Sequence, residues 1–341
     1  MNGGPERVYV LLTLATAALL ALALLFAVVA IVLRLRNTVV ERRWARLEAA
    51  WTPPLLEILA GDLQRTSLLR LVARADRFRF ADFLLRFARR LKGPEREVLR
   101  TLAAPVMDTV AERARRGSPE RRAVAVQILG ALGLPAQLVL LRHALDDPSP
   151  VVAMTAARAL ARRAQPAFIG DVVAHLPRFE RWSFGFLAST LAAFGPAAAP
   201  ALRAVLGDGA QPAWMRIVTA EALRMLHDPS AADRARAALD ATDPDLRAAA
   251  LRLLAAVGRP EDAPAVRALA SSPVDGVRAQ AVAALASLGG AADVPLLRAA
   301  LDDPSPWVVL RAAQSFKALG GVLPAGAPAG EGGLAALALA E

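Results

Sequence analysis

The three histidines are the residues whose type most readily supports metal or acid–base chemistry. His143 and His175 stand 32 residues apart, and His227 follows further along the chain. A neutral imidazole binds zinc or iron through one ring nitrogen. If His143 and His175 hold the same place in two successive helices, they can lie side by side and begin a metal site. No carboxylate stands at ligand spacing beside them, so we predict two ordinary, half-exposed histidines.

Other reactive sites have no sequence support. The chain has no cysteine, which excludes disulfides, thiolate zinc sites and cysteine nucleophiles. The phosphate-binding pattern GxxxxGK[ST], the dinucleotide pattern GxGxxG, the hydrolase pattern GxSxG and the zinc pattern HExxH do not occur. We therefore predict a protein that is not an enzyme, with no catalytic residue, no cofactor and no metal.

The elements that carry these residues are predicted to be helices of a repeat. The composition is rich in Ala, Leu and Arg, which are strong helix formers. An alanine recurs every 30 to 32 residues, at Ala125, Ala156, Ala188, Ala220, Ala250, Ala281 and Ala312. A large apolar residue follows one helical turn later, although Leu191 and Leu223 stand one position early. A small residue followed by a large one lets each helix pack closely against both neighbours.

Turn residues keep the same period. Asp or Ser precedes Pro at 147–148, 243–244, 272–273 and 303–304, where it ends one helix and caps the next. Glycines follow the alanine helices at Gly133, Gly195, Gly258, Gly289 and Gly320, where we expect the left-handed conformation. Each unit is predicted to run helix, Asp-Pro turn, helix, Gly turn.

Three segments resemble HEAT repeats of the short type named after phycobilisome lyases: 243–258 (DPDLRAAALRLLAAVG), 272–290 (SPVDGVRAQAVAALASLGG) and 302–321 (DDPSPWVVLRAAQSFKALGG). The resemblance covers 120–321 and implies an all-α, right-handed α-solenoid of helical hairpins. The units around 180–195 and 212–228 lack the Asp-Pro turn, and Val309 replaces the basic residue expected early in the second helix.

The resemblance implies an interaction scaffold whose surface binds a protein partner. One HEAT-repeat family is a di-iron hydroxylase that uses His-Glu pairs, but the histidines here are followed by Ala144, Leu176 and Asp228, so that activity is not carried over. The lyase family acts on bilin attachment as a two-chain complex. A lyase-like or metal-dependent enzyme in the solenoid groove stays an alternative.

A long uncharged run, Val8–Leu33, precedes the repeats. As a helix it reaches ~39 Å, enough to cross a hydrocarbon core of roughly 30 Å with some tilt. It is longer than the core of a signal peptide, and arginines follow it in place of a cleavage site. We predict a transmembrane helix that anchors a bacterial protein in the inner membrane. Because the positive charge lies on its C-terminal side, we expect the N-terminus outside and the solenoid in the cytoplasm.

The segment after the membrane is predicted to be an amphipathic helix that ends at Pro53–Pro54. The residues expected to contact the membrane surface are Arg34, Arg36, Arg42, Arg43, Arg46, Trp44 and Trp51. Alternatively, the stripe that carries the two tryptophans docks on the first helices of the soluble part. The expected divisions are therefore 1–7 (outside), 8–33 (transmembrane), 34–52 (juxtamembrane), 53–117 (diverged hairpins), 118–321 (HEAT repeats) and 322–341 (disordered tail).

The excess positive charge of the chain lies directly after the membrane segment. Residues 34–122 hold 21 basic and 11 acidic side chains, whereas residues 123–341 hold 19 of each. This placement favours a membrane surface over nucleic acid, although nucleic-acid binding by the basic region stays an alternative. First-helix arginines at Arg203, Arg236, Arg267 and Arg298 are predicted to form a solvated outer face. The implied partner is a membrane-associated protein, for which an accessory role beside a membrane enzyme such as a processive glycosyltransferase is one candidate.

Overall fold

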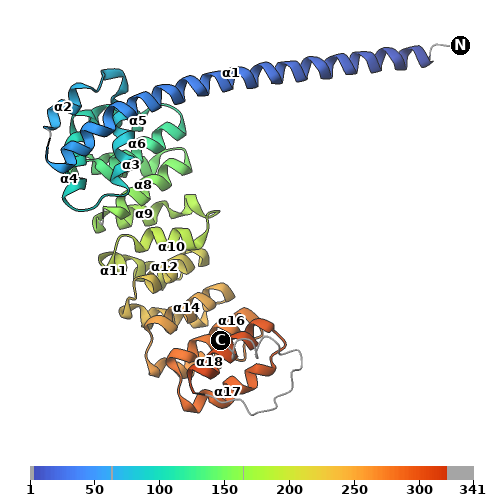
Figure 1. Cartoon of the computed structure of the whole chain (residues 1–341). Coiled ribbons are helices and arrows are strands. Elements are labelled where there is room, and N and C mark those ends of the chain that lie inside the picture. Colours follow the sequence, from blue (N-terminus) through green and yellow to red (C-terminus); the bar gives the residue numbers. More distant parts are fainter. Residues whose placement is uncertain (1–3, 63, 164, 321–341) are drawn as a thin grey trace. The chain divides into compact units, whose positions relative to one another are not determined.

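The computed structural model describes residues 4–62, 64–163 and 165–320, and these residues form helices and turns without a strand. The chain divides into two compact units, Met1–Val106 and Met107–Glu341, and each is considered by itself (Figure 1). The all-α class is therefore confirmed. The predicted tail 322–341 lies outside the described residues, as does part of the predicted segment 1–7.

The first unit begins with one long helix and continues with short ones. Its elements are α1 (Gly4–Ala60), α2 (Arg65–Arg70), η1 (Arg74–Asp76), α3 (Arg77–Ala88), α4 (Pro94–Ala103) and η2 (Ala104–Val106). Within α1, the stretch Leu14–Val32 has a mean hydropathy of 2.8, and none of it is buried. At 1.5 Å per residue it spans ~29 Å, which is the thickness of a bilayer core. A signal sequence would meet the same criterion of length and composition.

Helix α1 does not end at Pro53–Pro54, contrary to our prediction. A proline inside a helix costs ~3 kcal/mol because it removes an amide donor and crowds the preceding turn. Trp51, Leu55 and Ile58 are buried along the last part of α1. Each buried side chain of this size contributes about 2 kcal/mol, so packing of α1 against the rest of the first unit offsets the cost of the two prolines.

The second unit is a series of helical hairpins in sequence order (Figure 1). Its α-helices are α5 (Met107–Arg115), α6 (Pro119–Leu132), α7 (Leu138–His143), α8 (Pro150–Arg162), α9 (Ile169–His175), α10 (Phe184–Ala192), α11 (Ala199–Gly207), α12 (Ala213–Met225), α13 (Ala232–Ala237), α14 (Pro244–Val257), α15 (Ala263–Leu269), α16 (Asp275–Leu288), α17 (Val294–Ala299) and α18 (Pro306–Ala318). Short 3-10 turns flank the odd-numbered helices: η3 (Pro135–Gln137), η4 (Ala144–Asp146), η5 (Pro166–Phe168), η6 (Leu176–Phe179), η7 (Pro196–Ala198), η8 (Pro229–Ala231), η9 (Ala238–Asp240), η10 (Pro260–Asp262), η11 (Ala291–Asp293) and η12 (Ala300–Asp302).

The even-numbered helices α6 to α18, here called the second helices, each pack against the next one in the series. Each of these helices carries one of the periodic alanines, and all seven are fully buried. The large residues one turn later are buried too, including Leu191 and Leu223 at their shifted positions. Gly130 on α6 shows how close the helices come, because a Cβ there would collide with Ala159 on α8. The predicted alternation of small and large residues is confirmed as the core of the array.

The helix ends differ in detail from the prediction. Gly195 and Gly320 have a positive φ, as predicted, but Gly133, Gly258 and Gly289 have an extended backbone with φ of −65°, −71° and −82°. At Gly258 glycine is favoured for another reason, since a Cβ would lie 2.6 Å from the carbonyl oxygen of Leu254. Asp243 caps α14 as expected.

Asp147 and Asp303, by contrast, lie two residues before the caps of α8 and α18. There a second proline takes the first helical position and moves the start of the helix along the chain.

Within the second unit, arginine–aspartate pairs join one helical repeat to the next. Arg122 donates to both carboxylate oxygens of Asp147 at 2.8 Å, and Arg278 binds Asp303 in the same way at 2.9 Å. Arginines of the first helices also bind aspartates: Arg203 contacts Oδ2 of Asp228 at 2.6 Å, Arg236 contacts Oδ1 of Asp262 at 2.5 Å, and Arg267 contacts both oxygens of Asp293. The face predicted to be merely solvated therefore carries links between units at three of its four arginines. Partners 25 or 26 residues apart meet because that separation leads from one unit to the turn of the next.

We expect Asp303→Asn to destabilise the last two helical repeats by about 1–3 kcal/mol at pH 7. The substitution weakens the charge-assisted pair with Arg278, which is mostly shielded from water. The hydrogen bond from Arg278 lowers the pKa of Asp303. A lowered folded-state pKa gives stability that is complete above the unfolded value of about 3.9 and is lost as pH falls through the folded value. The difference between the wild type and Asp303→Asn should therefore shrink below pH ~4.

Hydrogen exchange of the α16 and α18 amides, followed in the full chain between pH 7 and 3, measures this difference. The matched control is Asp302→Asn, which removes the same charge from an exposed neighbour. Equal effects of the two substitutions, or a difference that does not change with pH, would contradict the prediction.

Candidate binding surface on the second helices

Each second helix buries its alanine face and leaves one stripe open. On α8 the stripe consists of Val151, Thr155, Arg158 and Arg162, spaced four, three and four residues apart, all exposed or half-exposed. That spacing places them on one side of a helix. On the next second helix, α10, the corresponding residues are Trp182 just before the helix, then Phe186, Ser189 and Ala193. Neighbouring stripes form a continuous surface because α8, α10 and α12 pack side by side.

Four aromatic side chains near the starts of α10 and α12, here called the aromatic cluster, form two ring pairs: Trp182 with Phe186 on this surface, and Phe184 with Trp214. The ring centroids of Trp182 and Phe186 are 5.6 Å apart, and Phe184 on α10 stacks on Trp214 of α12 at 6.2 Å. All four are half-buried or exposed, with Phe184 37% exposed. Rigid aromatic side chains left open to solvent supply large contact areas at little entropic cost and dominate many protein interfaces.

A pocket of about 270 Å³ opens beside the cluster, between α8 and α10. Its lining residues are Arg158, Ala161, Arg162, Ser189, Thr190 and Ala193. The guanidinium carbon of Arg158 lies 4.8 Å from the centre of the Phe186 ring, so the arginine is held over the aromatic cluster. Ser189 and Thr190 donate their hydroxyl protons to the carbonyl of Phe186, at 2.8 and 3.0 Å. We call this feature the Arg158 pocket.

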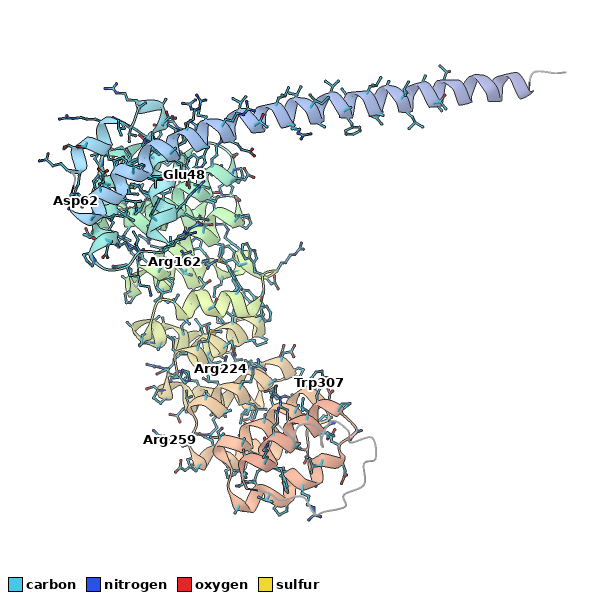
Figure 2. The ribbon with its side chains drawn as sticks, viewed as in Figure 1. Glu48, Asp62, Arg162, Arg224, Arg259 and Trp307 are labelled. Carbon is cyan, nitrogen blue, oxygen red and sulfur yellow. The ribbon has the colours of Figure 1, made fainter. Side chains whose placement is uncertain are left out.

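Further along the same face the charges are paired within the array. Glu221 on α12 binds Arg224 at 2.6 Å and faces Arg252 of α14 at 3.8 Å. The hydrogen bond from Arg224 lowers the pKa of the Glu221 carboxyl. Figure 2 labels Arg162 and Arg224 at different levels of the array.

The histidines are not brought together as a metal site. His143 and His175 end the helices α7 and α9, but the ring of His175 contacts Asp146 through Nε2 at 2.9 Å and the carbonyl of Asp171 through Nδ1 at 2.6 Å. The sequence did not predict the contact between His175 and Asp146, because Asp146 comes from the preceding helical repeat. Its hydrogen bond with His175 lowers the pKa of Asp146. Within the described residues, no group of three or more possible metal ligands comes together.

The third histidine has a local structural role. His227 adopts a φ of 50°, the left-handed conformation that Gly195 adopts at the end of the preceding second helix. Histidine is among the residues that tolerate this conformation better than most. His227 therefore ends α12 in place of a glycine.

All of the predicted membrane-surface residues lie on α1, but they do not share one environment. Arg34, Arg42 and Arg46 are exposed, whereas the side chain of Arg36 is outside those that the structure describes. Arg43 is exposed as well, and it also binds Asp76 at 2.8 Å. Contact between the exposed arginines and anionic lipid stays a prediction.

Trp51 is not placed to touch a membrane surface, which corrects that part of the prediction. It is only 1% exposed, and its ring lies 5.3 Å from Phe80 and 5.5 Å from Phe83 of α3. Trp44 is half-buried, with the guanidinium of Arg86 at 4.3 Å over its ring. The stripe of α1 that carries both tryptophans thus docks on the first unit, which is the alternative that the sequence left open.

A profile of HEAT repeats matches residues 107–177 and 232–317. Over both stretches the chain is similar to HEAT repeats. The first match begins inside the segment 53–117, where we expected diverged hairpins, and therefore includes α5. The phycobilisome-lyase subtype is not distinguished by this match. The stretch between the two HEAT matches, 178–231, contains the entire aromatic cluster.

Solved structures give distant likenesses. An engineered protein aligns at 19% identity over 70% of this chain and 96% of its own, with a TM-score of 0.32. Human deoxyhypusine hydroxylase in complex with glycerol aligns at 16% identity over 81% and 98%, with a TM-score of 0.33. The karyopherin Kap121p, as a mutant, aligns at 15% identity over 72% of this chain and 33% of its own, with a TM-score of 0.42. A comparison with curated protein sequences gives no match.

We expect Trp51→Ala to destabilise the first unit by about 3–5 kcal/mol, because it leaves a large cavity beside Phe80 and Phe83. Trp44→Ala removes a half-buried ring and a cation–π contact, and should cost about 1 kcal/mol. Hydrogen exchange of the α3 amides in the detergent-solubilised full chain reports the difference. Equal loss of protection in the two variants would mean that Trp51 is not the anchor of this core.

Proposed function

We propose that this chain is a HEAT-repeat scaffold that holds a protein partner on the exposed face of its second helices. The observation that carries the proposal is the aromatic cluster on α10 and α12, with an arginine-lined pocket beside it. Solenoids bind through the area of such extended faces. An open aromatic patch on an otherwise charged surface is typical of an interaction site.

The proposal includes no reaction. The side chains on this face that could move protons are engaged with one another, as Glu221 is with Arg224 and Arg252. His175 is likewise occupied by Asp146 and the Asp171 carbonyl. The surface therefore offers contact area and fixed charge, which support binding.

We also infer that α1 anchors the scaffold in the inner membrane as a single span, with the N-terminus outside and the HEAT repeats in the cytoplasm. The exposed apolar stretch Leu14–Val32 supports the anchor, and the exposed arginines Arg34, Arg42 and Arg46 after it support the orientation. An anchor confines the binding face to the membrane surface and raises its effective concentration toward membrane partners. An accessory subunit of a membrane enzyme is the role that fits this arrangement.

The absence of native cysteine makes the orientation directly testable with single reporters. A membrane-impermeant maleimide should label Asn2→Cys in spheroplasts but should label Ser271→Cys, in an exposed turn, only after lysis. The reverse pattern would invert the topology. A mature chain whose N-terminus lies after Leu33, as measured by mass spectrometry, would replace the anchor with a signal sequence.

Partner binding is expected to depend on the cluster. Once a partner is identified by cross-linking to the full chain in membranes, Trp214→Ala should weaken its binding by about 30-fold, as expected when a central aromatic contact is lost. Trp307→Ala is the matched control, since Trp307 is 68% exposed on α18, outside the cluster. Unchanged binding by Trp182→Ala/Trp214→Ala in a chain with normal helix content would move the partner off this face.

A further inference from the structure

The Arg158 pocket has a one-sided charge. Its two ionisable lining residues are Arg158 and Arg162, and the other lining groups are alanine methyls and two hydroxyls. Those hydroxyls already donate to the Phe186 carbonyl, so the N–H groups of Arg158 are the donors best placed to bind a ligand. The pocket therefore favours a group that accepts hydrogen bonds and carries negative charge.

The side-chain conformation of Arg158 is suited to binding a negatively charged group. Its guanidinium lies over the Phe186 ring at 4.8 Å, which restricts the side chain and occupies one face of the guanidinium plane. Stacking leaves the in-plane N–H groups available, and these form the fork that binds a carboxylate through both oxygens. Among the described residues, Arg158 forms no salt bridge with an acidic side chain.

Arginines at equivalent places along the array differ in whether they have an acidic neighbour. Arg158, Ser189, Glu221 and Arg252 hold equivalent places on α8, α10, α12 and α14, separated by 31, 32 and 31 residues. Arg252 faces Glu221 of the preceding second helix at 3.8 Å, so there the array supplies its own carboxylate. At the equivalent place on the second helix before it, α6, Arg158 has Gln127, and on the one after it, α10, it has Ser189. The arginine at the pocket thus lacks the acidic neighbour that the equivalent arginine has.

We propose that the Arg158 pocket binds an acidic side chain of a partner's peptide segment, while an apolar side chain next to it packs on Trp182 and Phe186. This inference rests on the proposed function and adds the chemistry of the partner: a segment in which Asp or Glu stands beside a large apolar residue. The pocket's arginines supply the charge complementarity, and the adjoining rings supply the apolar contact.

Single-stranded nucleic acid is another ligand that binds arginine and aromatic side chains together, but the rest of the array does not favour it. Single-stranded nucleic acid is held along its backbone by a positive groove that continues over several nucleotides. Residues 123–341 hold 19 basic and 19 acidic side chains, and next along this face Glu221 introduces negative charge. One carboxylate beside an apolar group matches a single arginine pocket better than a run of phosphates.

The test is selection of random 12-residue peptides on the full chain in zwitterionic phosphatidylcholine nanodiscs, followed by affinity measurements. We expect enriched peptides to carry Asp or Glu beside Trp, Phe or Leu. Arg158→Gln should weaken them by about tenfold or more, as expected for the loss of a charge-assisted contact. Arg252→Gln, the equivalent arginine on α14, should leave their affinity unchanged. Arg158→Glu should regain binding when the peptide's acidic residue is exchanged for arginine.

The outcomes separate this inference from the scaffold proposal. Peptides that need Trp214 but show no preference for acidic residues would overturn the carboxylate pocket and leave the scaffold standing. No enrichment, or enriched peptides that bind Arg158→Gln as well as wild type, would also overturn the pocket. Tighter binding of a 20-nucleotide single strand than of the best peptide, lost in Arg158→Gln, would assign the pocket to nucleic acid instead.

Discussion

Close packing between successive second helices is the constraint on which the second unit depends. Each of these helices carries a fully buried alanine, and at Gly130 even a methyl group would be excluded. Helices that approach this closely bury one continuous core, which no single hairpin could form alone. The arginine–aspartate pairs then fix each unit against the next at the edge of that core. A regular core in turn leaves a regular open stripe on every second helix.

The fold could be predicted from the sequence because its cause repeats. One alanine every 30 to 32 residues, followed by a large residue one turn later, specifies the same local contact seven times, so an error in one unit does not change the result. Helix ends were harder to predict, because a glycine can be required either by a left-handed φ, as at Gly195, or by a crowded carbonyl, as at Gly258. The sequence pattern is the same in both cases.

The tryptophans of α1 show why single-stripe patterns are ambiguous. A stripe of Trp44 and Trp51 satisfies both a membrane surface and a protein core, since each offers an apolar environment. The decision depends on Phe80 and Phe83, which belong to a separate helix, α3, and whose approach no periodicity reports. The same burial explains why α1 continues through Pro53 and Pro54. Tertiary contacts override the local rule in both cases.

The sequence does not predict the binding surface residue by residue, because reactive groups have recognisable motifs, whereas this surface consists of groups that make contacts. Its location nevertheless left a signal. The units around 180–195 and 212–228 lack the Asp-Pro turn, shift their large residues by one position, and lie between the two HEAT matches. The aromatic cluster appears where the repeat departs from the pattern, on α10 and α12. Arg158 lies beside it on α8, within the first HEAT match. A binding face is therefore best sought where a repeat keeps its core and loses its consensus, because the core alone maintains the scaffold and leaves the open stripe free to vary.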